Sequence, residues 1–294
     1  MNRIAHIEVI VDPSRAGRQD AVDKAAVLSR CLNASIELLI CDSDSNTQQL
    51  DLLDALAAPL RAQGTEVTLR TIHGESLHDT LLDYLRASNA GLVVKDTHHH
   101  SLAKRTFLRN TDWHLTRGCP VPLLLTKKRP WGQPRVIMAA VDPAQANERA
   151  AALDRDILHS AASLAVRLAG DLHVIHTFIP AAFAAAVAAG GRAMTAEYSQ
   201  AVQAENSYRY SQIERLVAGF RVTRGHLHIE MGTPEDCLVR TVTQHHTDVM
   251  VMGASSHGRW HRMVAGSTAS TILETLPCDI LIVKPLDDAQ TVPF

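Results

Sequence analysis

The chain carries the stretch VIVDP at residues 9–13, and a matching stretch, AAVDP, stands at residues 139–143. Two more landmarks recur in the same order: AGLVV at 90–94 with TDVMV at 247–251, and CPVPLLL at 119–125 with CDILIV at 278–283. The offset between the copies grows from 130 to 159 residues, so the second copy holds 29 extra residues, which we place in the Ala-rich segment at about 178–205. Landmarks that recur in one order predict two copies of one structural unit.

Short apolar stretches alternate with helical patterns in both copies. Five strands are expected in each, at 4–11, 35–41, 66–72, 92–94 and 121–125, and then at 135–141, 172–177, 222–230, 249–252 and 280–283. Among the helices, one over 76–87 has Ser76 as its N-terminal cap. Short apolar strands separated by helices indicate buried parallel strands with right-handed crossovers. The fold class is therefore α/β, with two tandem doubly wound, open, parallel five-stranded sheets.

The polar, proline-bearing segment 127–134 joins the two copies, and we expect domains at 1–130 and 131–294. The 294-residue length agrees with two domains. Five widely spaced cysteines without a CxxC pair indicate reduced thiols, and so a cytoplasmic protein.

Charge and hydropathy exclude two classes of partner. The 29 Lys and Arg residues are balanced by 31 Asp and Glu residues, so no nucleic-acid partner is expected. The longest apolar stretch, 178–189, contains Pro180 and falls short of the ~20 residues that span a bilayer. The N-terminus also lacks the apolar segment of a signal peptide. We therefore expect no membrane insertion.

The loop GASSHGRWHRMVAGST at residues 253–268 is the stretch most suggestive of ligand binding. A strand is expected to end at Gly253 and a helix to begin near Ser267. Small residues let the backbone approach a ligand, and the N–H groups at a helix start attract phosphate. No Gly-Lys-Ser/Thr follows, so this is not a Walker motif. The alternative is a plain strand–helix connection with Ser267 as an ordinary cap.

This loop resembles the nucleotide-binding signature of the universal stress protein family, which is Gly, two residues, Gly, nine residues, then Gly and Ser or Thr. Asp142 after the first strand of the second copy and the final strand at 278–285 also match that family. VKDTH at 94–98 and TDWHL at 111–115 further resemble its tandem E-type members. The resemblance covers nearly the whole chain. It implies an α/β fold, a cytoplasmic stress-induced role, and ATP binding where the motif is kept.

The resemblance also implies a set of ligand contacts in the second copy. Asp142 would hold the ribose or an adenine edge, and Val141 and Val174 would offer apolar contact to the base. The phosphates of ATP, with or without Mg²⁺, would lie in a cradle made by Gly253, Ser255, Ser256, Gly266, Ser267 and Thr268. No catalytic residue is placed by the sequence, so we expect binding, with slow hydrolysis at most.

Two departures from the family pattern bear on where ATP binds. Ser256 stands where the family has Gly, and a backbone with φ > 0 there would favour Gly. In the first copy, KDTHHH at 95–100 occupies the loop and Leu108–Arg109 the Gly–Ser position. Bulky side chains crowd a phosphate cradle, so the first copy is not expected to bind ATP in the family manner.

Two other function classes stay open. The apolar segment 179–191 would suit a lid over an apolar or lipid-like ligand, or a subunit interface in a homodimer. A chain with inert sites would instead act as a scaffold.

Histidines suggest a metal site only weakly. The run at 98–100 would need His73 or His114 to complete a site, because adjacent residues on an extended segment point in alternating directions. We interpret it as a polar loop, treat the pairs His226/His228 and His245/His246 in the same way, and expect no metal. Asp12, the counterpart of Asp142, is interpreted as a helix-start cap or an ion-pair partner of Lys95.

Overall fold

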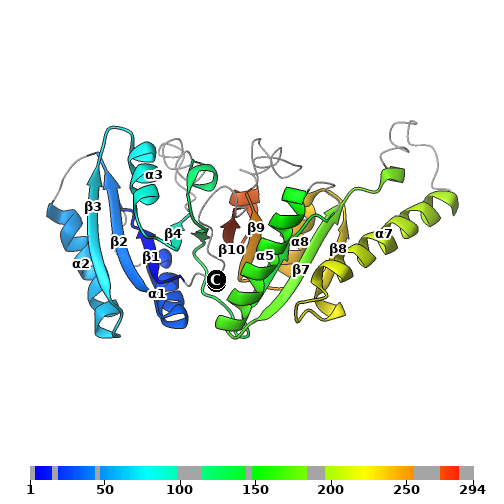
Figure 1. Ribbon diagram of the computed structural model, residues 1–294, viewed down its shortest axis with the longest axis horizontal. Coiled ribbons are helices and arrows are strands. Elements are labelled where there is room, and N and C mark those ends of the chain that lie inside the picture. The colour runs from blue at the N-terminus through cyan, green and yellow to red at the C-terminus, as the bar shows by residue number, and fades with distance from the viewer. Residues whose placement is uncertain are drawn as a thin grey trace.

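The computed structural model describes residues 4–14, 19–43, 47–97, 114–143, 148–183, 196–254 and 272–284. Ten strands form one sheet in the order β3-β2-β1-β4-β5-β10-β9-β6-β7-β8 (Figure 1). The strands of the first half are β1 (His6–Ile10), β2 (Ser35–Asp42), β3 (Val67–His73), β4 (Leu92–Asp96) and β5 (Leu123–Thr126). Those of the second half are β6 (Val136–Ala140), β7 (Asp171–Phe178), β8 (Leu227–Met231), β9 (Val249–Gly253) and β10 (Asp279–Val283).

Helices cover both faces of this sheet. They are α1 (Asp20–Leu32), α2 (Thr47–Ala62), α3 (Leu77–Ala87), α5 (Glu148–Arg167), α7 (Ala196–Val217) and α8 (Pro234–Gln244), with a 3-10 turn, η1 (Arg224–His226), before β8. Shorter helical stretches lie at 114–118, 181–183 and 272–275. Helix α7 projects beyond β8 at the end of the molecule, as Figure 1 shows. It buries only Ile213 and Val217, near its C-terminal end.

Each half is doubly wound and parallel within itself, and the predicted α/β fold class is confirmed. The two halves are also joined, because β5 pairs with β10 in antiparallel register, with Leu124 opposite Leu281. This pairing turns two five-stranded sheets into one ten-stranded sheet, which was not predicted. Both strands are wholly buried. An exposed apolar edge strand has unpaired backbone N–H and C=O groups that can pair with another strand. Here β5 and β10 pair these groups with each other.

The core consists of two layers, one on each face of the sheet. Alternate residues of a strand point to opposite faces, so Leu38 joins the layer under α1 and α2 while Leu39 joins the layer under α3. Helices α5 and α7 extend the first layer across the second half, and α8 extends the other. Strands buried on both faces explain the apolar runs by which the sequence revealed them.

A buried ion pair fastens α1 of the first half to β10 of the second. Lys24 Nζ lies 2.7 Å from Asp279 Oδ1, and both side chains are less than a tenth exposed. The carboxylate also accepts hydrogen bonds of 2.7 Å from the Lys127 backbone N–H and from Trp131 Nε1. Burial raises the pKa of the Asp279 carboxyl, while Lys24 and the other donors oppose that rise. The segment that joins the halves is thus held by the same carboxylate.

Candidate functional site

The candidate site lies where the strand order of the second half reverses. The chain runs from β6 to β7 and β8 on one side, then returns to β9 on the other side of β6. Ala139 is opposite Val251 in this pair, so Asp142 after β6 and Gly253 at the end of β9 come to the same edge. Ligands of open parallel sheets bind at such a switch point, beyond the carboxyl ends of the strands.

Asp142 is held at this edge by two neighbours. Its backbone N–H donates a 3.1 Å hydrogen bond to Asp154 Oδ1, which comes from α5. The second neighbour is His176 of β7, with its Nδ1 3.0 Å from the Val141 carbonyl oxygen. Because a carbonyl oxygen only accepts, Nδ1 is the donor of this hydrogen bond. The same nitrogen is 3.8 Å from Asp142 Oδ1. The backbone at Val141 and Asp142 is therefore held in place, and a ring nitrogen of His176 lies near the Asp142 carboxylate.

Asp154 has a strongly perturbed acidity. The pKa of its carboxyl is raised to about 7, chiefly by burial; the hydrogen bond from the Asp142 N–H opposes this rise, and the nearby charge of Asp142 adds to it. A substantial fraction of Asp154 is thus protonated near neutral pH. The edge consequently carries less negative charge than its two carboxyl groups suggest, which reduces the repulsion of an anionic ligand.

Gly253 packs closely against α5. A Cβ on this residue would lie 2.6 Å from Leu153 Cδ2, so any other residue here would displace the Leu153 side chain. The next backbone N–H, that of Ala254, donates to the Val283 carbonyl at 2.8 Å. Gly253, which the sequence analysis assigned to ligand contact, therefore also lies in the packing interface between β9 and α5.

The other predicted contacts fall into two groups. Val141 and Val174 are both buried in the core, and Val174 is level with Ala139, two residues before Val141 along the sheet. The proposed phosphate contacts Ser255, Ser256, Gly266, Ser267 and Thr268 lie outside the described residues. The structure thus brings Asp142, Val141 and Gly253 to one edge and places Val174 beneath it.

Two residues of this edge, Asp154 and His176, were missed from the sequence. Both are polar residues at positions where the pattern calls for apolar ones: Asp154 on the buried face of α5, and His176 in the buried strand β7. A buried polar residue needs a partner, and a polar residue at a predicted buried position is the signal by which the sequence could have identified them. Their partner is the segment Val141–Asp142.

The first half fills the equivalent edge with its own side chain. Asp96 stands at the position of Gly253, 157 residues earlier. Its Oδ1 accepts hydrogen bonds from the Ala21 N–H at 2.7 Å and from Thr126 Oγ1 at 2.5 Å, and Lys95 Nζ donates to its carbonyl at 2.9 Å. The start of α1, which attracts anions, is therefore occupied by a buried carboxylate.

Asp12 makes local contacts before α1. Its Oδ1 accepts from the backbone N–H of Ser14 at 2.9 Å and from Ser14 Oγ at 2.7 Å. The Gln19 side-chain amide and the Asp12 backbone exchange two hydrogen bonds of 3.2 Å. Asp12 therefore stabilises the turn after β1 and is not the cap of α1, whose N-cap is Gln19 and whose Ala21 N–H donates to Asp96.

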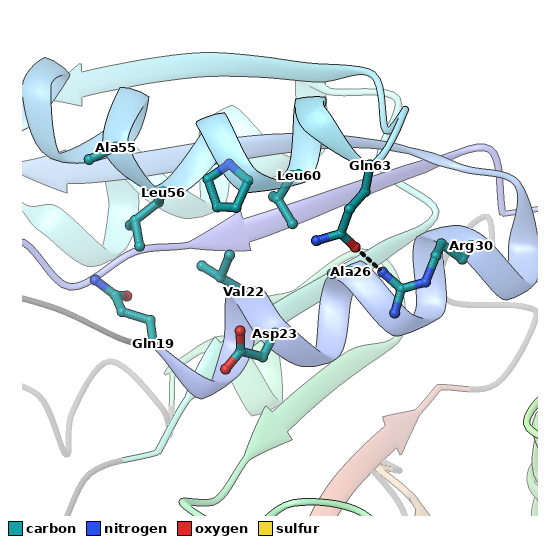
Figure 2. Close-up of a pocket in the computed structure, with 10 residues that line it drawn as sticks. Gln19, Val22, Asp23, Ala26, Arg30, Ala55, Leu56, Leu60 and Gln63 are labelled. Carbon is teal, nitrogen blue, oxygen red and sulfur yellow. Dashed lines mark hydrogen bonds between the residues drawn. The ribbon is translucent and has the colours of Figure 1, made fainter.

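A separate groove of about 330 Å³ lies between α1 and α2, on the outer side of the first half (Figure 2). It is lined by Val22, Leu56 and Leu60 among others, and Arg30 donates to Gln63 across it at 2.8 Å. It lies in the helix layer and not at the carboxyl ends of the strands.

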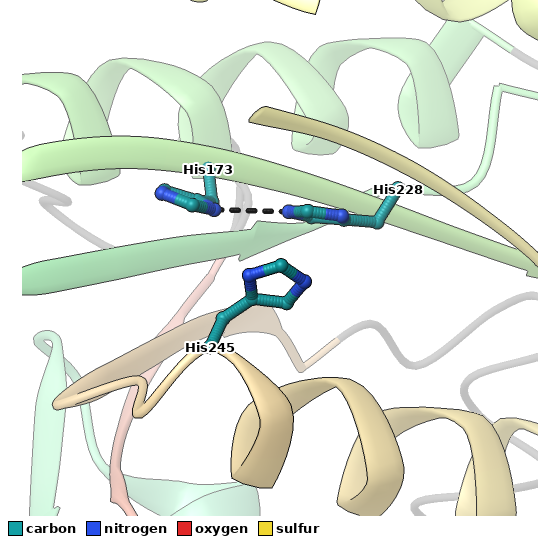
Figure 3. A group of neighbouring side chains, drawn as sticks. All are labelled: His173, His228 and His245. Carbon is teal, nitrogen blue, oxygen red and sulfur yellow. Dashed lines mark hydrogen bonds between the residues drawn. The ribbon is translucent and has the colours of Figure 1, made fainter. Parts of the chain in front are cut away.

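The structure brings together histidines that the sequence analysis did not group. The run at 98–100 lies outside the described residues, and His114 stacks on His78 with ring centroids 4.7 Å apart. His173, His228 and His245 instead converge beneath α8 (Figure 3). Burial, together with neighbouring imidazoles, lowers the pKa of His173 and His228 to about 4. These two rings are therefore neutral at physiological pH.

None of the helices within the described ranges combines the length and apolar character needed to cross a bilayer. All five cysteines are free thiols.

Relatives of the chain share one name. It is 20% identical to universal stress protein E of Salmonella typhi over 304 residues, covering 96% of this chain and 95% of that protein. The match to universal stress protein E of Escherichia coli K12 is 21% over 229 residues, with 78% and 71% covered. A homologue from Haemophilus influenzae is 23% identical over 208 residues, with 70% and 66% covered. The resemblance to the E-type members is thus confirmed.

Solved structures agree with this at the level of the fold. A protein of Pseudomonas aeruginosa PAO1, described as functionally unknown, is 27% identical with a TM-score of 0.72, covering 97% of this chain and 94% of that one. A universal stress protein of Archaeoglobus fulgidus has a TM-score of 0.66 at 17% identity, with 96% and 97% covered. Residues 134–284, more than half of the chain, match the sequence profile of the Universal stress protein family. The chain belongs to the universal stress protein family.

Proposed function

We propose that this protein binds an adenine nucleotide, ATP with or without Mg²⁺, at the switch point of its second half. Membership of the family supports a role in the stress response. The observation that carries the ligand assignment is the place of Asp142, whose backbone is held by Asp154 at the same carboxyl edge of β6 and β9 as Gly253. The cytoplasmic location stays a prediction that rests on the cysteines.

The chemistry of the edge suits such a ligand. A carboxylate accepts hydrogen bonds from two adjacent ribose hydroxyls, and such charge-assisted bonds are the stronger kind. Partial protonation of Asp154 limits repulsion of the phosphates. The loop that follows Gly253 would supply the cradle of Ser255, Ser256, Gly266, Ser267 and Thr268.

The proposal restricts this site to the second half. In the first half, Asp96 takes the place of Gly253 and its carboxylate bonds the start of α1. A second anion there would be repelled by a buried charge. We therefore expect one nucleotide per chain and binding without appreciable turnover.

The test is calorimetric titration of the full-length protein with ATP, in the presence and in the absence of Mg²⁺. Asp142→Asn keeps the size of the side chain and removes its charge, so ATP affinity should fall roughly 10- to 100-fold. Asp12→Asn is the matched control, because Asp12 holds the equivalent position in the other copy, and it should leave affinity unchanged. Gly266→Trp should abolish binding. No saturable binding in the wild type, or equal losses in both Asp variants, would refute the proposal.

An apolar or lipid-like ligand is the second candidate. Ile179 and Phe183, which begin the apolar insertion, are 48% and 51% exposed. Residues 184–191 of that segment lie outside the described part of the chain. Mass spectrometry of whatever is released when the purified protein is denatured separates the candidates: an acyl-bearing molecule would favour this one, and an adenine nucleotide the first.

A further inference from the structure

Three histidines converge under the C-terminal end of α8. In the β7–β8 register Ile175 is opposite His228, so His173, two residues before Ile175, points to the same face of the sheet as His228. Helix α8 covers this face and ends at His245, whose backbone N–H donates to the Thr241 carbonyl at 3.0 Å. Figure 3 shows the His245 ring directed toward the other two.

The nitrogen–nitrogen distances lie on either side of those in a zinc site. His173 Nδ1 and His228 Nε2 are 2.9 Å apart, and one ring nitrogen from each of the three residues lies within 4.8 Å of the others. Nitrogens around a tetrahedral Zn²⁺ lie roughly 3.3 Å apart, since each Zn–N bond is about 2.0–2.1 Å long. Shifts of about an ångström at the side chains would bring all three to an ion.

The three rings make most of their hydrogen-bond and ring contacts with other imidazoles. His173 and His228 are 8% and 9% exposed, and the hydrogen bond between them uses one nitrogen of each. Within the described residues, the His245 side chain makes ring contacts, 4.2 Å between centroids with His228, but no hydrogen bond. His226 stacks on His173 at 4.0 Å and limits its rotation. Four imidazoles in one patch are thus packed mainly against one another.

We propose that His173, His228 and His245 form a binding site for a divalent transition-metal ion of the zinc type. Imidazole nitrogen is a good ligand for Zn²⁺, and three histidine ligands leave a fourth position for water or another donor. The ion would take the place of the hydrogen bond between His173 and His228, and the proton of that bond would move to the other nitrogen of its own ring. It would link the C-terminal end of α8 to the edge strand β8 and to β7.

This site is separate from the proposed nucleotide site. His173 is opposite Met138 in the β6–β7 register, four residues before Asp142, or roughly 13 Å along the strand direction. It therefore lies toward the amino ends of the strands. ATP binding and metal binding are expected to be independent, and failure of one leaves the other standing.

The test uses full-length protein stripped with a chelator and dialysed, with Zn²⁺ alone as the probe. The chain has 16 histidines, so weak surface binding is expected in every variant and the difference between variants decides. Calorimetry should show one tight equivalent in the wild type, weakened at least tenfold in His245→Gln. His246→Asn is the control, because His246 is exposed and adjacent but outside the set, and it should match the wild type.

A spectroscopic measurement guards against a folding artefact. Co²⁺ in place of Zn²⁺ should give the visible absorption of a four-coordinate ion in the wild type and in His246→Asn, and lose it in His245→Gln. Circular dichroism checks that His245→Gln is folded, which is expected because His245 is only partly buried at a helix end. The proposal is overturned if the wild type has no tight equivalent, or if His245→Gln binds Zn²⁺ like the wild type.

Discussion

Asp154 is a carboxyl group placed where its charge is disfavoured. It is 6% exposed, and its pKa is raised from an ordinary 3.8 to about 7, mainly by burial. In the unfolded chain the same group loses its proton near pH 4. Between about pH 4 and pH 7 the folded state therefore binds more protons than the unfolded state, and this group makes stability fall as pH rises through that window.

Asp154→Asn should consequently stabilise the protein in a pH-dependent way. The amide keeps an acceptor oxygen for the Asp142 N–H but carries no charge. The change that this substitution makes in the free energy of unfolding should be more favourable at pH 8 than at pH 4, by roughly 1–4 kcal/mol. Urea unfolding at both pH values measures it, with the exposed Asp51→Asn as control. An Asp154→Asn effect that does not change with pH would contradict this explanation.

Among single residues, the sequence identified those that stand at the ends of predicted strands. Asp142 and Gly253 stand at strand ends, and the ends of apolar strands are visible in a sequence. Asp154 and His176 were not identified, because their role depends on how α5 and β7 pack around Val141. His228 was misjudged for a similar reason: the burial of a histidine on an edge strand is decided by the helix that covers it.

Between elements, α1 and β10 meet through two buried charged side chains. Lys24 and Asp279 are 255 positions apart in the chain and nearly inaccessible to solvent. A buried pair of this kind is expensive to break, because removal of one partner leaves the other charge buried. Its role is to fix how the helix layer of one half meets the sheet of the other.

Lys24→Met should therefore be strongly destabilising. We expect a loss of about 3–5 kcal/mol in the free energy of unfolding. Arg86→Met provides the control, since Arg86 and Asp83 form an exposed pair at the same 2.7 Å distance, and about 1 kcal/mol or less is expected there. Chemical denaturation followed by circular dichroism compares them. Comparable losses in the two variants would show that burial of the pair is unimportant.

Elements were predicted well where local patterns determine them. Ser76 caps α3 as expected, its side chain accepting from the Asp79 N–H. The strand expected at 222–230 instead begins at Leu227, because η1 occupies Arg224–His226 just after Thr223. The β5–β10 pairing was beyond reach, since nothing local to either strand specifies an antiparallel partner more than 150 residues away.

Over the whole molecule, the ten-stranded sheet makes the two halves one structural body. The apolar layers on both faces run across the β5–β10 junction, and Trp131 lies beside it with its Nε1 bonded to Asp279. Unfolding either half would expose a wholly buried strand of the other. The halves are therefore expected to unfold together.

Equilibrium unfolding should show one cooperative transition. Far-ultraviolet circular dichroism reports on both halves, and tryptophan fluorescence includes the junction through Trp131. Coincident midpoints from the two probes are the expected result. Two resolved transitions, or fluorescence that changes well before the helical signal, would indicate that the halves are stable separately.

The single covalent link between the halves has a consequence for symmetry. In an assembly of two identical chains, every substitution appears twice, and both ligand edges must change together. Here the segment 127–134 keeps the halves at a high effective concentration, so their pairing does not depend on the amount of protein present. Each edge is then free to diverge. Asp96 in one copy and Gly253 in the other are such a divergence: the same position places an internal carboxylate at one edge and no side chain at the other.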